Sequence, residues 1–120
     1  EYEKAAEKAE LMLETYPDLK VMCCLSTEGI KAAADVVKAR GQASEVKVIG
    51  LGLPDQMEEY VGSDPEDVCP VLYIWRGDQE LLLGGRTYPM DYGHDGGLEV
   101  IAGEPIRVDS ENIGYWKDQI

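Results

Sequence analysis

The chain has 120 residues, 44% of them hydrophobic, and this length fits one domain with a modest buried core. Its 24 acidic and 11 basic side chains give a formal net charge of -13, which would repel a nucleic-acid backbone or an anionic membrane surface. No apolar run approaches the ~18 residues of a membrane-spanning helix, and the charged opening EYEKAAEKAE lacks the pattern of a signal peptide, so we expect a soluble globular chain without an export signal.

The first predicted elements are a helix over residues 2–16 and a strand over residues 19–25. Pro17 ends the helical pattern, and the strand LKVMCCL is apolar throughout, as is typical of a central parallel strand. STEGIKAAADVVKARG then predicts a helix with Ser26 or Thr27 as N-cap and Gly41 as the C-terminal stop. Its apolar stripe, at helical spacing, consists of Ile30, Ala33, Ala34 and Val37.

A second strand, VKVIG over residues 46–50, runs into a glycine-rich corner. Asp55 followed by Glu58 has the spacing of a capping box, which predicts a short helix over residues 56–60. SDPED is typical of a loop, and PVLYIW over residues 70–75 predicts a third buried strand. This alternation implies parallel pairing with right-handed crossovers, so we expect an α/β three-layer sandwich with a mainly parallel, flavodoxin-like sheet.

The last third of the chain is less regular. RGDQELLLGG predicts at most a short helix, TYPMDYGHDGG a loop, and LEVIAGEPIRVD one or two short strands around a Gly-Glu-Pro turn. SENIGYWKDQI is expected to form a terminal helical turn capped by Ser110.

The cysteines Cys23, Cys24 and Cys69 form neither a CxxC pair nor a metal-binding quartet. Cys23 and Cys24 are neighbours in a predicted strand, so their side chains should point to opposite faces. Buried free thiols are the favoured interpretation, and a metal site or a reactive thiol is the alternative.

Candidate chemistry is expected beyond the carboxyl ends of the predicted strands, where open parallel sheets bind ligands. The corners 25–27, 50–55 and 75–78 offer hydroxyls, backbone amides, an indole, a guanidinium and carboxylates, a mixture that suits a polyhydroxylated ligand better than a phosphate. The indole of Trp75 either packs into the core or stacks on the apolar face of a sugar.

Motifs for other chemistries are absent. G-x-x-x-x-G-K-[ST], G-x-G-x-x-G and the hydrolase elbow G-x-S-x-G do not occur, so we expect no nucleotide cofactor and no enzyme activity. His94 lies in a Gly/Asp-rich loop and is interpreted as a solvated residue. Asp91 and Asp95 beside it lack the spacing of a calcium-binding EF-hand, so no metal is expected.

At the corners 25–27, 50–55 and 75–78 the sequence resembles the C-terminal lobe of type I periplasmic sugar-binding proteins, the solute receptors of ABC importers. The nearest branch is that of the rhamnose and autoinducer receptors. The resemblance covers almost the whole chain and rests on AEKAELMLETYPDLKVM, STEGIKAAADVVKARG, VKVIGLGLPDQMEEYVG, the strand that ends in Trp75, and VIAGEPIRVDSENIGYW. It implies a sugar-binding lobe, a periplasmic or extracellular lipoprotein-like location, and the importer's membrane subunits as partners of the full receptor. The ligand-binding residues it implies are Leu25, Ser26, Thr27, Leu53, Pro54 and Trp75.

Two departures from the family limit what the resemblance implies. Residues 1–120 correspond to a single lobe, so the N-terminal lobe is absent, and the segment between Trp75 and GGRTY is shorter than in family members and leaves no room for a long helix. A lone lobe presents an open face, so we expect weak affinity for a free sugar. An uncovered sheet face would favour association with a second copy, and the alternative function is therefore an interaction or dimerisation module that keeps the fold without the ligand.

Overall fold

The structure is a computed structural model that describes residues 1–74 and 105–119. The chain divides into two compact units, and the described residues lie almost entirely in the first, which consists of residues 1–74 and 107–120. None of the helices in residues 1–74 and 105–119 has the length and apolar character of a membrane span.

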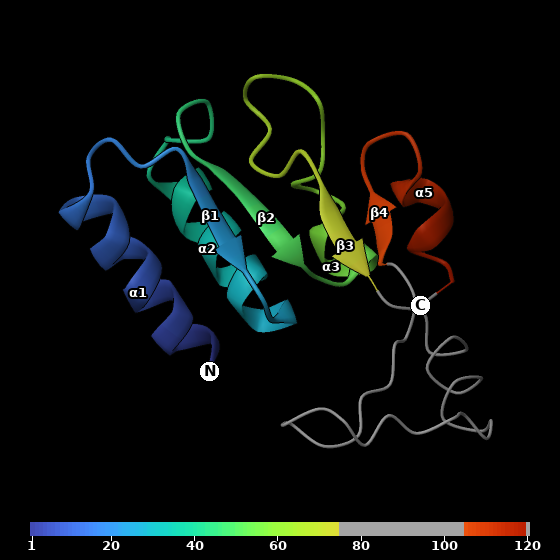
Figure 1. The fold of residues 1–120 in the computed structure, drawn as a ribbon, viewed down its shortest axis with the longest axis horizontal. Coiled ribbons are helices and arrows are strands. Elements are labelled where there is room, and N and C mark those ends of the chain that lie inside the picture. The colour runs from blue at the N-terminus through green and yellow to red at the C-terminus, as the bar shows by residue number, and fades with distance from the viewer. Residues whose placement is uncertain (75–104, 120) are drawn as a thin grey trace, which may run out of the picture. The chain divides into compact units, whose positions relative to one another are not determined.

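An open four-stranded sheet forms the centre of this unit, in the order β1 (Val21–Cys24), β2 (Lys47–Leu51), β3 (Leu72–Ile74) and β4 (Ile106–Val108). β1 pairs with β2, and β2 with β3, both in parallel. Figure 1 shows these three strands pointing the same way, with β4 beside β3 and running in the opposite direction. The expected α/β fold with a mainly parallel sheet is therefore confirmed.

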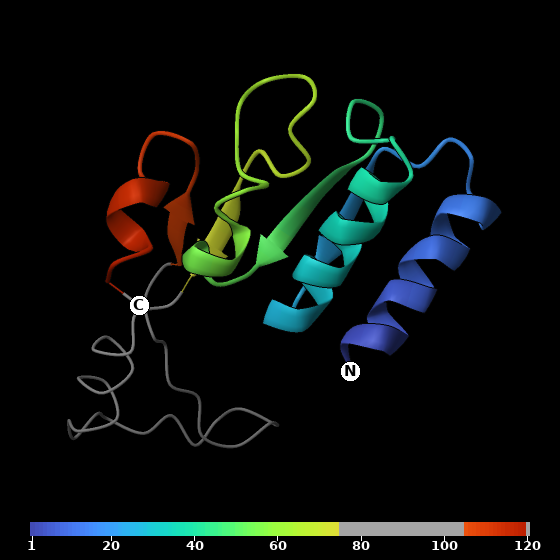
Figure 2. The ribbon, with the colours of Figure 1, turned by 180° about the vertical axis from the view of Figure 1, so that it is seen from behind.

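The helices α1 (Tyr2–Thr15) and α2 (Thr27–Ala39) pack against each other. Figure 2, seen from behind, shows α2 and the short α3 (Pro54–Met57) in front of the strands, so both cover the same face of the sheet. The stripe predicted for α2 is buried as expected, with Ile30 and Val37 completely enclosed. Burying an aliphatic side chain of this size contributes ~1.5–3 kcal/mol, so α2 is a main support of the sheet.

The glycine corner at the end of β2 begins at Gly50, whose backbone conformation favours glycine. Gly50 has φ 141°, and a Cβ placed there would lie 1.8 Å from the carbonyl oxygen of Cys24 on the neighbouring strand. The absence of a side chain at this position therefore allows β2 to pair closely with β1.

The predicted start of the helix after this corner is wrong. α3 begins at Pro54, with Leu53 as its N-cap, and no side chain caps it. Proline is pre-organised for the first helical position because its φ is fixed and it lacks the N–H that would be left unpaired. Asp55 therefore lies inside the first turn, and the expected capping box with Glu58 does not form.

The predicted cap of the last helix is also wrong. α5 (Ile113–Trp116) has Asn112 at its N-cap position instead of Ser110. The preceding turn is closed by two side chains: Asn112 Oδ1 accepts a hydrogen bond from the Asp109 N–H at 2.8 Å, and Asp109 Oδ1 accepts one from the Glu111 N–H at 3.0 Å. These local bonds hold residues 109–112 in a turn, so the helix begins only after Asn112.

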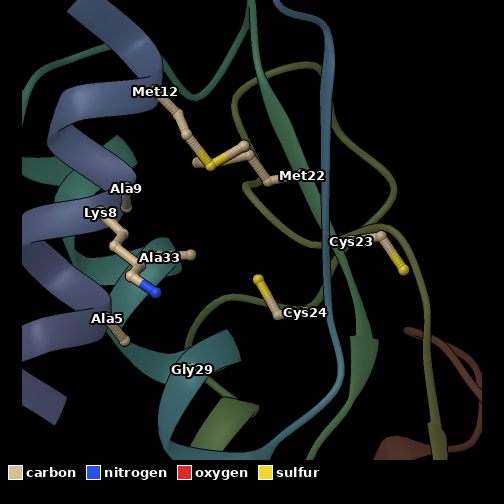
Figure 3. A pocket seen from close by; sticks show the side chains of 9 residues that line it. All are labelled: Ala5, Lys8, Ala9, Met12, Met22, Cys23, Cys24, Gly29 and Ala33. Atoms are coloured by element: carbon tan, nitrogen blue, oxygen red, sulfur yellow. The ribbon is translucent and has the colours of Figure 1, made fainter. Parts of the chain in front are cut away.

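The three cysteines are free, but only one of them is fully buried as expected. Burial raises the pKa of the Cys69 thiol to about 11, and it also raises the pKa of the half-buried Cys24. Cys23 is exposed, which contradicts the interpretation as a buried thiol. Figure 3 shows the reason: Cys24 points toward the helices, whereas Cys23 points to the opposite side of β1.

Some predictions lie outside the described residues. These are the end of the third strand at Trp75, the short helix of RGDQELLLGG, the loop that contains His94, and the first part of LEVIAGEPIRVD.

Candidate ligand site at the carboxyl edge of the sheet

The carboxyl ends of the parallel strands meet at one edge of the sheet. The register pairs Cys24 with Gly50 and Leu51 with Tyr73, so the chain leaves each strand at a similar height. The loop 25–27 follows β1, and the corner 52–54 follows β2. The structure thus brings together the two described corners that the sequence singled out, while Trp75 lies outside the described residues.

The loop after β1 presents a large apolar side chain beside two hydroxyls. Leu25 is 76% exposed, Ser26 is exposed and Thr27 is half-buried. Ser26, one of the two predicted N-caps, is the N-cap of α2: its Oγ accepts a hydrogen bond from the Gly29 N–H at 3.0 Å. Because this bond uses the oxygen as an acceptor, the hydroxyl hydrogen of Ser26 remains available for a ligand oxygen.

The corner after β2 is closely packed against β3 and α2. The Gly52 N–H donates to the Tyr73 carbonyl at 3.4 Å and is therefore used within the sheet. A Cβ on Gly52 would lie 3.0 Å from Ile30 Cγ2, which shows how closely the corner rests on α2. Leu53 is half-buried and Pro54 is fully buried, so Leu53 is the more accessible of the two predicted ligand-binding residues.

Two further residues near this edge were missed by sequence reasoning. Tyr73, on β3, is half-buried, and the guanidinium of Arg107 on the neighbouring β4 interacts with its hydroxyl. Arg107 Nε also donates to Asp109 Oδ2 at 3.3 Å, and this bond is the main reason why the pKa of Arg107 is raised. The two residues are far apart in sequence and belong to no motif, so only the strand order reveals their proximity.

A cluster of polar side chains around Asp35 holds α2 in place. This helix begins directly after the loop that follows β1. Asp35 accepts hydrogen bonds from the hydroxyls of Tyr2 and Tyr60 and pairs with Lys31 at 3.4 Å. Lys31 Nζ also donates to Glu59 Oε1 at 2.8 Å and lies 4.6 Å from the centre of the Tyr60 ring. The cluster therefore joins α1, α2 and the segment after α3.

The charged groups of this cluster, Asp35, Lys31 and Glu59, all have hydrogen-bond or ion-pair partners within it. Burial alone would raise the pKa of Asp35, but the hydroxyls of Tyr2 and Tyr60 and the ammonium of Lys31 outweigh it, so the pKa is lowered. Burial and the bond to Asp35 raise the pKa of Tyr60 to about 12. The cluster is a structural brace, and the described part of the chain contains no group of His, Cys, Asp or Glu side chains that could hold a metal ion.

Several solved structures share this architecture. An ABC transporter solute-binding protein from Clostridium phytofermentas with bound L-rhamnose has a TM-score of 0.83 and 31% sequence identity; the match covers 98% of this chain and 46% of that one. A sugar ABC transporter protein from Actinomyces odontolyticus matches with a TM-score of 0.71 and 22% identity, over 95% of this chain and 42% of its own.

LsrB from Clostridium saccharobutylicum, in complex with AI-2, also has a TM-score of 0.71, with 14% identity over 95% of this chain and 44% of its own. The chain thus spans less than half the length of each of these receptors. No protein-family model and no curated protein sequence matches it. The predicted resemblance is confirmed: the chain has the fold of part of an ABC-transporter sugar-binding protein.

Proposed function

We propose that the chain is the C-terminal, sugar-binding lobe of an ABC-transporter solute-binding protein and that it is not an enzyme. The observation that carries this proposal is the gathering of Ser26, Thr27 and Leu53 at the carboxyl edge of a parallel sheet, in a fold that matches a receptor solved with L-rhamnose. Such an edge is where open α/β sheets bind small ligands.

The side chains at this edge suit a sugar. Ser26 and Thr27 offer hydroxyls, and the first turn of α2 offers backbone N–H groups without intrahelical partners, so hydroxyl groups of a ligand find both donors and acceptors. Leu25 and Leu53 add apolar surface beside them. Trp75, the next residue after β3, would supply an indole face for the apolar side of a sugar ring.

The lobe on its own offers only part of an enclosing cleft. Binding sites for small molecules usually bury most of the ligand, whereas a single edge leaves one side of the sugar in water. We therefore propose weak sugar binding by this chain alone. In the full receptor, a second lobe would close over the sugar outside the cytoplasm, and the importer's membrane subunits would be the partners.

Calorimetric titration of the purified chain with L-rhamnose and a panel of other monosaccharides tests the proposal. We expect about millimolar or tighter binding to at least one sugar, weakened about fivefold or more in Thr27→Ala and in Trp75→Ala, because each change removes a hydrogen bond or a stacking surface. Thr15→Ala, at the exposed end of α1, is the matched control and should bind as the wild type does. A folded wild-type chain that binds no sugar would contradict the proposal.

A second candidate is an interaction module that keeps the fold without a ligand. It is favoured by large apolar side chains on the surface, among them Leu25 at 76% and Val21 at 48% exposed. Absence of sugar binding together with specific binding of a protein segment would support this candidate.

A further inference from the structure

The two described corners of the candidate site are connected underneath by a buried side chain. Ile30, in the first turn of α2, is completely enclosed, and so are Pro54 and Met57 of α3. Figure 2 shows α2 and α3 on the same face of the sheet. The side chain of Ile30 thus belongs to the helix that follows the loop 25–27 and packs beneath the corner 52–54.

Gly52 is the point of contact in the corner. A Cβ placed there would lie 3.0 Å from Ile30 Cγ2 and 3.4 Å from Met57 Cγ. Carbon atoms in ordinary contact are ~3.5–4.0 Å apart, so the corner has no room for a methyl group beside Ile30. Of the described glycines, only Gly41 and Gly50 have a positive φ, so packing is the reason for glycine at position 52.

Ile30 has little freedom to turn away from an added methyl group. Its Cβ is branched, and a branched side chain in a helix has one strongly preferred χ1 rotamer. Met57, on the other side of Gly52, is unbranched and adapts more easily. A methyl group at position 52 would therefore displace α2 from the corner by a few tenths of an ångström.

A displacement of Ile30 is passed directly to the loop after β1. The Ile30 N–H donates a hydrogen bond to the Ser26 carbonyl at 3.0 Å, and the Gly29 N–H donates one to Ser26 Oγ at 3.0 Å. Thr27 is the first residue of α2. The hydroxyls of Ser26 and Thr27 therefore move with this helix.

The corner after β2 is held by other elements. The Gly52 N–H donates to the Tyr73 carbonyl of β3 at 3.4 Å, and the Leu53 carbonyl accepts hydrogen bonds from the N–H groups of Gln56 and Met57 at 3.1 Å. The corner thus keeps its place on β3 and α3 when α2 is displaced. Any such displacement changes the distance between the two corners.

We propose that Ile30 and Gly52 are positioning residues of the candidate site: their contact sets the distance between the hydroxyls of Ser26 and Thr27 and the corner 52–54. The inference rests on the proposed function, because this distance affects affinity only for a sugar that touches both corners. Hydrogen bonds weaken steeply when their geometry departs from the optimum, so a small change in this distance lowers affinity.

The test compares the ¹⁵N-labelled wild-type chain with Gly52→Ala, each titrated with L-rhamnose. We expect the amide signals of Ser26 and Thr27 to shift in the free variant and its affinity to fall about fivefold or more, as for one weakened hydrogen bond. Adding Ile30→Val to Gly52→Ala should restore both, because valine lacks the Cδ1 methyl group and returns the added volume.

Two controls separate positioning from stability. Gly114→Ala adds the same methyl group where a Cβ meets nothing within 4 Å, and it should change neither readout. Val37→Ala removes buried apolar volume from the same helix, two turns after Ile30. It should lower the midpoint of thermal unfolding and leave the affinity for L-rhamnose unchanged.

Unchanged amide signals at Ser26 and Thr27 in Gly52→Ala would overturn the proposal, with or without sugar binding. Wild-type affinity in this variant would also overturn it, as would a loss of affinity that Ile30→Val does not restore. A wild-type chain that binds no sugar contradicts the proposed function instead. The amide signals of the free variant then decide by themselves whether the contact sets the distance.

Discussion

Three glycines in this chain differ in backbone conformation and in the space around their Cα atoms. Gly50 combines a positive φ with a close approach to the Cys24 carbonyl, whereas Gly41 has φ 70° with open space around its Cα. Gly114, in α5, has open space and an ordinary φ. A side chain would therefore meet both a steric clash and backbone strain at Gly50, backbone strain alone at Gly41, and neither at Gly114.

Alanine substitutions at these glycines should lower the free energy of unfolding most at Gly50, less at Gly41 and least at Gly114. Gly50→Ala should destabilise by more than about 2 kcal/mol, because its Cβ would overlap the backbone of β1, and Gly41→Ala by about 1 kcal/mol through strain alone. Gly114→Ala is the control and should be neutral or slightly stabilising. Urea unfolding followed by circular dichroism measures all three, and equal stability of Gly50→Ala and wild type would refute the close strand approach.

Asp35 makes the stability of the chain depend on pH. Its pKa is lower in the folded state than the ordinary 3.8, so its stabilising contribution is present above about 3.8 and is lost as the pH falls through the folded value. Tyr60 acts at the other end: its folded pKa of about 12 exceeds the ordinary 10.0, so its contribution is present below 10 and lost as the pH rises toward 12.

Asp35→Asn should therefore be less stable than wild type at neutral pH, by about 1 kcal/mol, and the difference should shrink as the pH falls below about 4. Unfolding in urea at a series of pH values measures it. Asp18→Asn, at an exposed position before β1, is the control and should track wild type. A difference that stays constant down to the acid limit would show that the carboxylate charge is not what stabilises the cluster.

At the scale of the elements, α2 is defined by its own residues. Ser26 caps its start, the buried stripe faces the sheet, and Gly41 follows its end. α5 differs, because the side chains of Asp109 and Asn112 shape the turn before it and Ser110 takes no part in the cap.

The two serines therefore provide a matched pair. Ser26→Ala should cost about 1 kcal/mol, because the Gly29 N–H loses its acceptor, whereas Ser110→Ala should change stability by less than about 0.5 kcal/mol. Thermal and urea unfolding compare the two variants. A similar loss in both would contradict the assigned caps.

The amino end of β2, opposite the candidate site, is held in place by the side chain of Lys47. Lys47 Nζ donates to the carbonyl oxygens of Ala43 at 2.8 Å, Pro65 at 2.7 Å and Asp67 at 2.6 Å. The ammonium thereby ties two loops to the strand with three charge-assisted hydrogen bonds. A rigid amino end helps to keep the strand ends at the candidate site in a fixed register.

At the scale of the whole molecule, excess negative charge opposes compaction. The 24 acidic side chains outnumber the 11 basic ones, so 13 negative charges stay unbalanced even if every basic side chain forms an ion pair, as Lys31 does with Glu59 and Lys117 with Glu58. Repulsion among the remaining carboxylates is long-range and is screened by salt.

Raising NaCl from about 10 mM to about 200 mM should therefore raise the midpoint of thermal unfolding by a few degrees. Differential scanning calorimetry measures the shift. Sucrose at equal osmolality, which does not screen charge, separates screening from solvent exclusion. A midpoint that falls with salt would mean that the surface ion pairs outweigh the general repulsion.

Much of the fold was predictable because it depends on short-range patterns. The apolar strands, the stripe and cap of α2, and the alternation of strands and helices each follow from residues close together in sequence, and they yielded the mainly parallel sheet. The loop after β1 could be proposed as a site for the same reason, since the ends of parallel strands meet at one edge.

The sequence by itself determined the strands, the strongest helix, the direction of the sheet and the resemblance to sugar receptors. Only the tertiary structure decided that Asp35 meets Tyr2 and Tyr60, 33 and 25 residues away, and that Cys23 faces outward on an edge strand. The physical reason is that local periodicity reports on bonds within a few residues, whereas contacts and exposure across elements depend on where packing places each strand and helix.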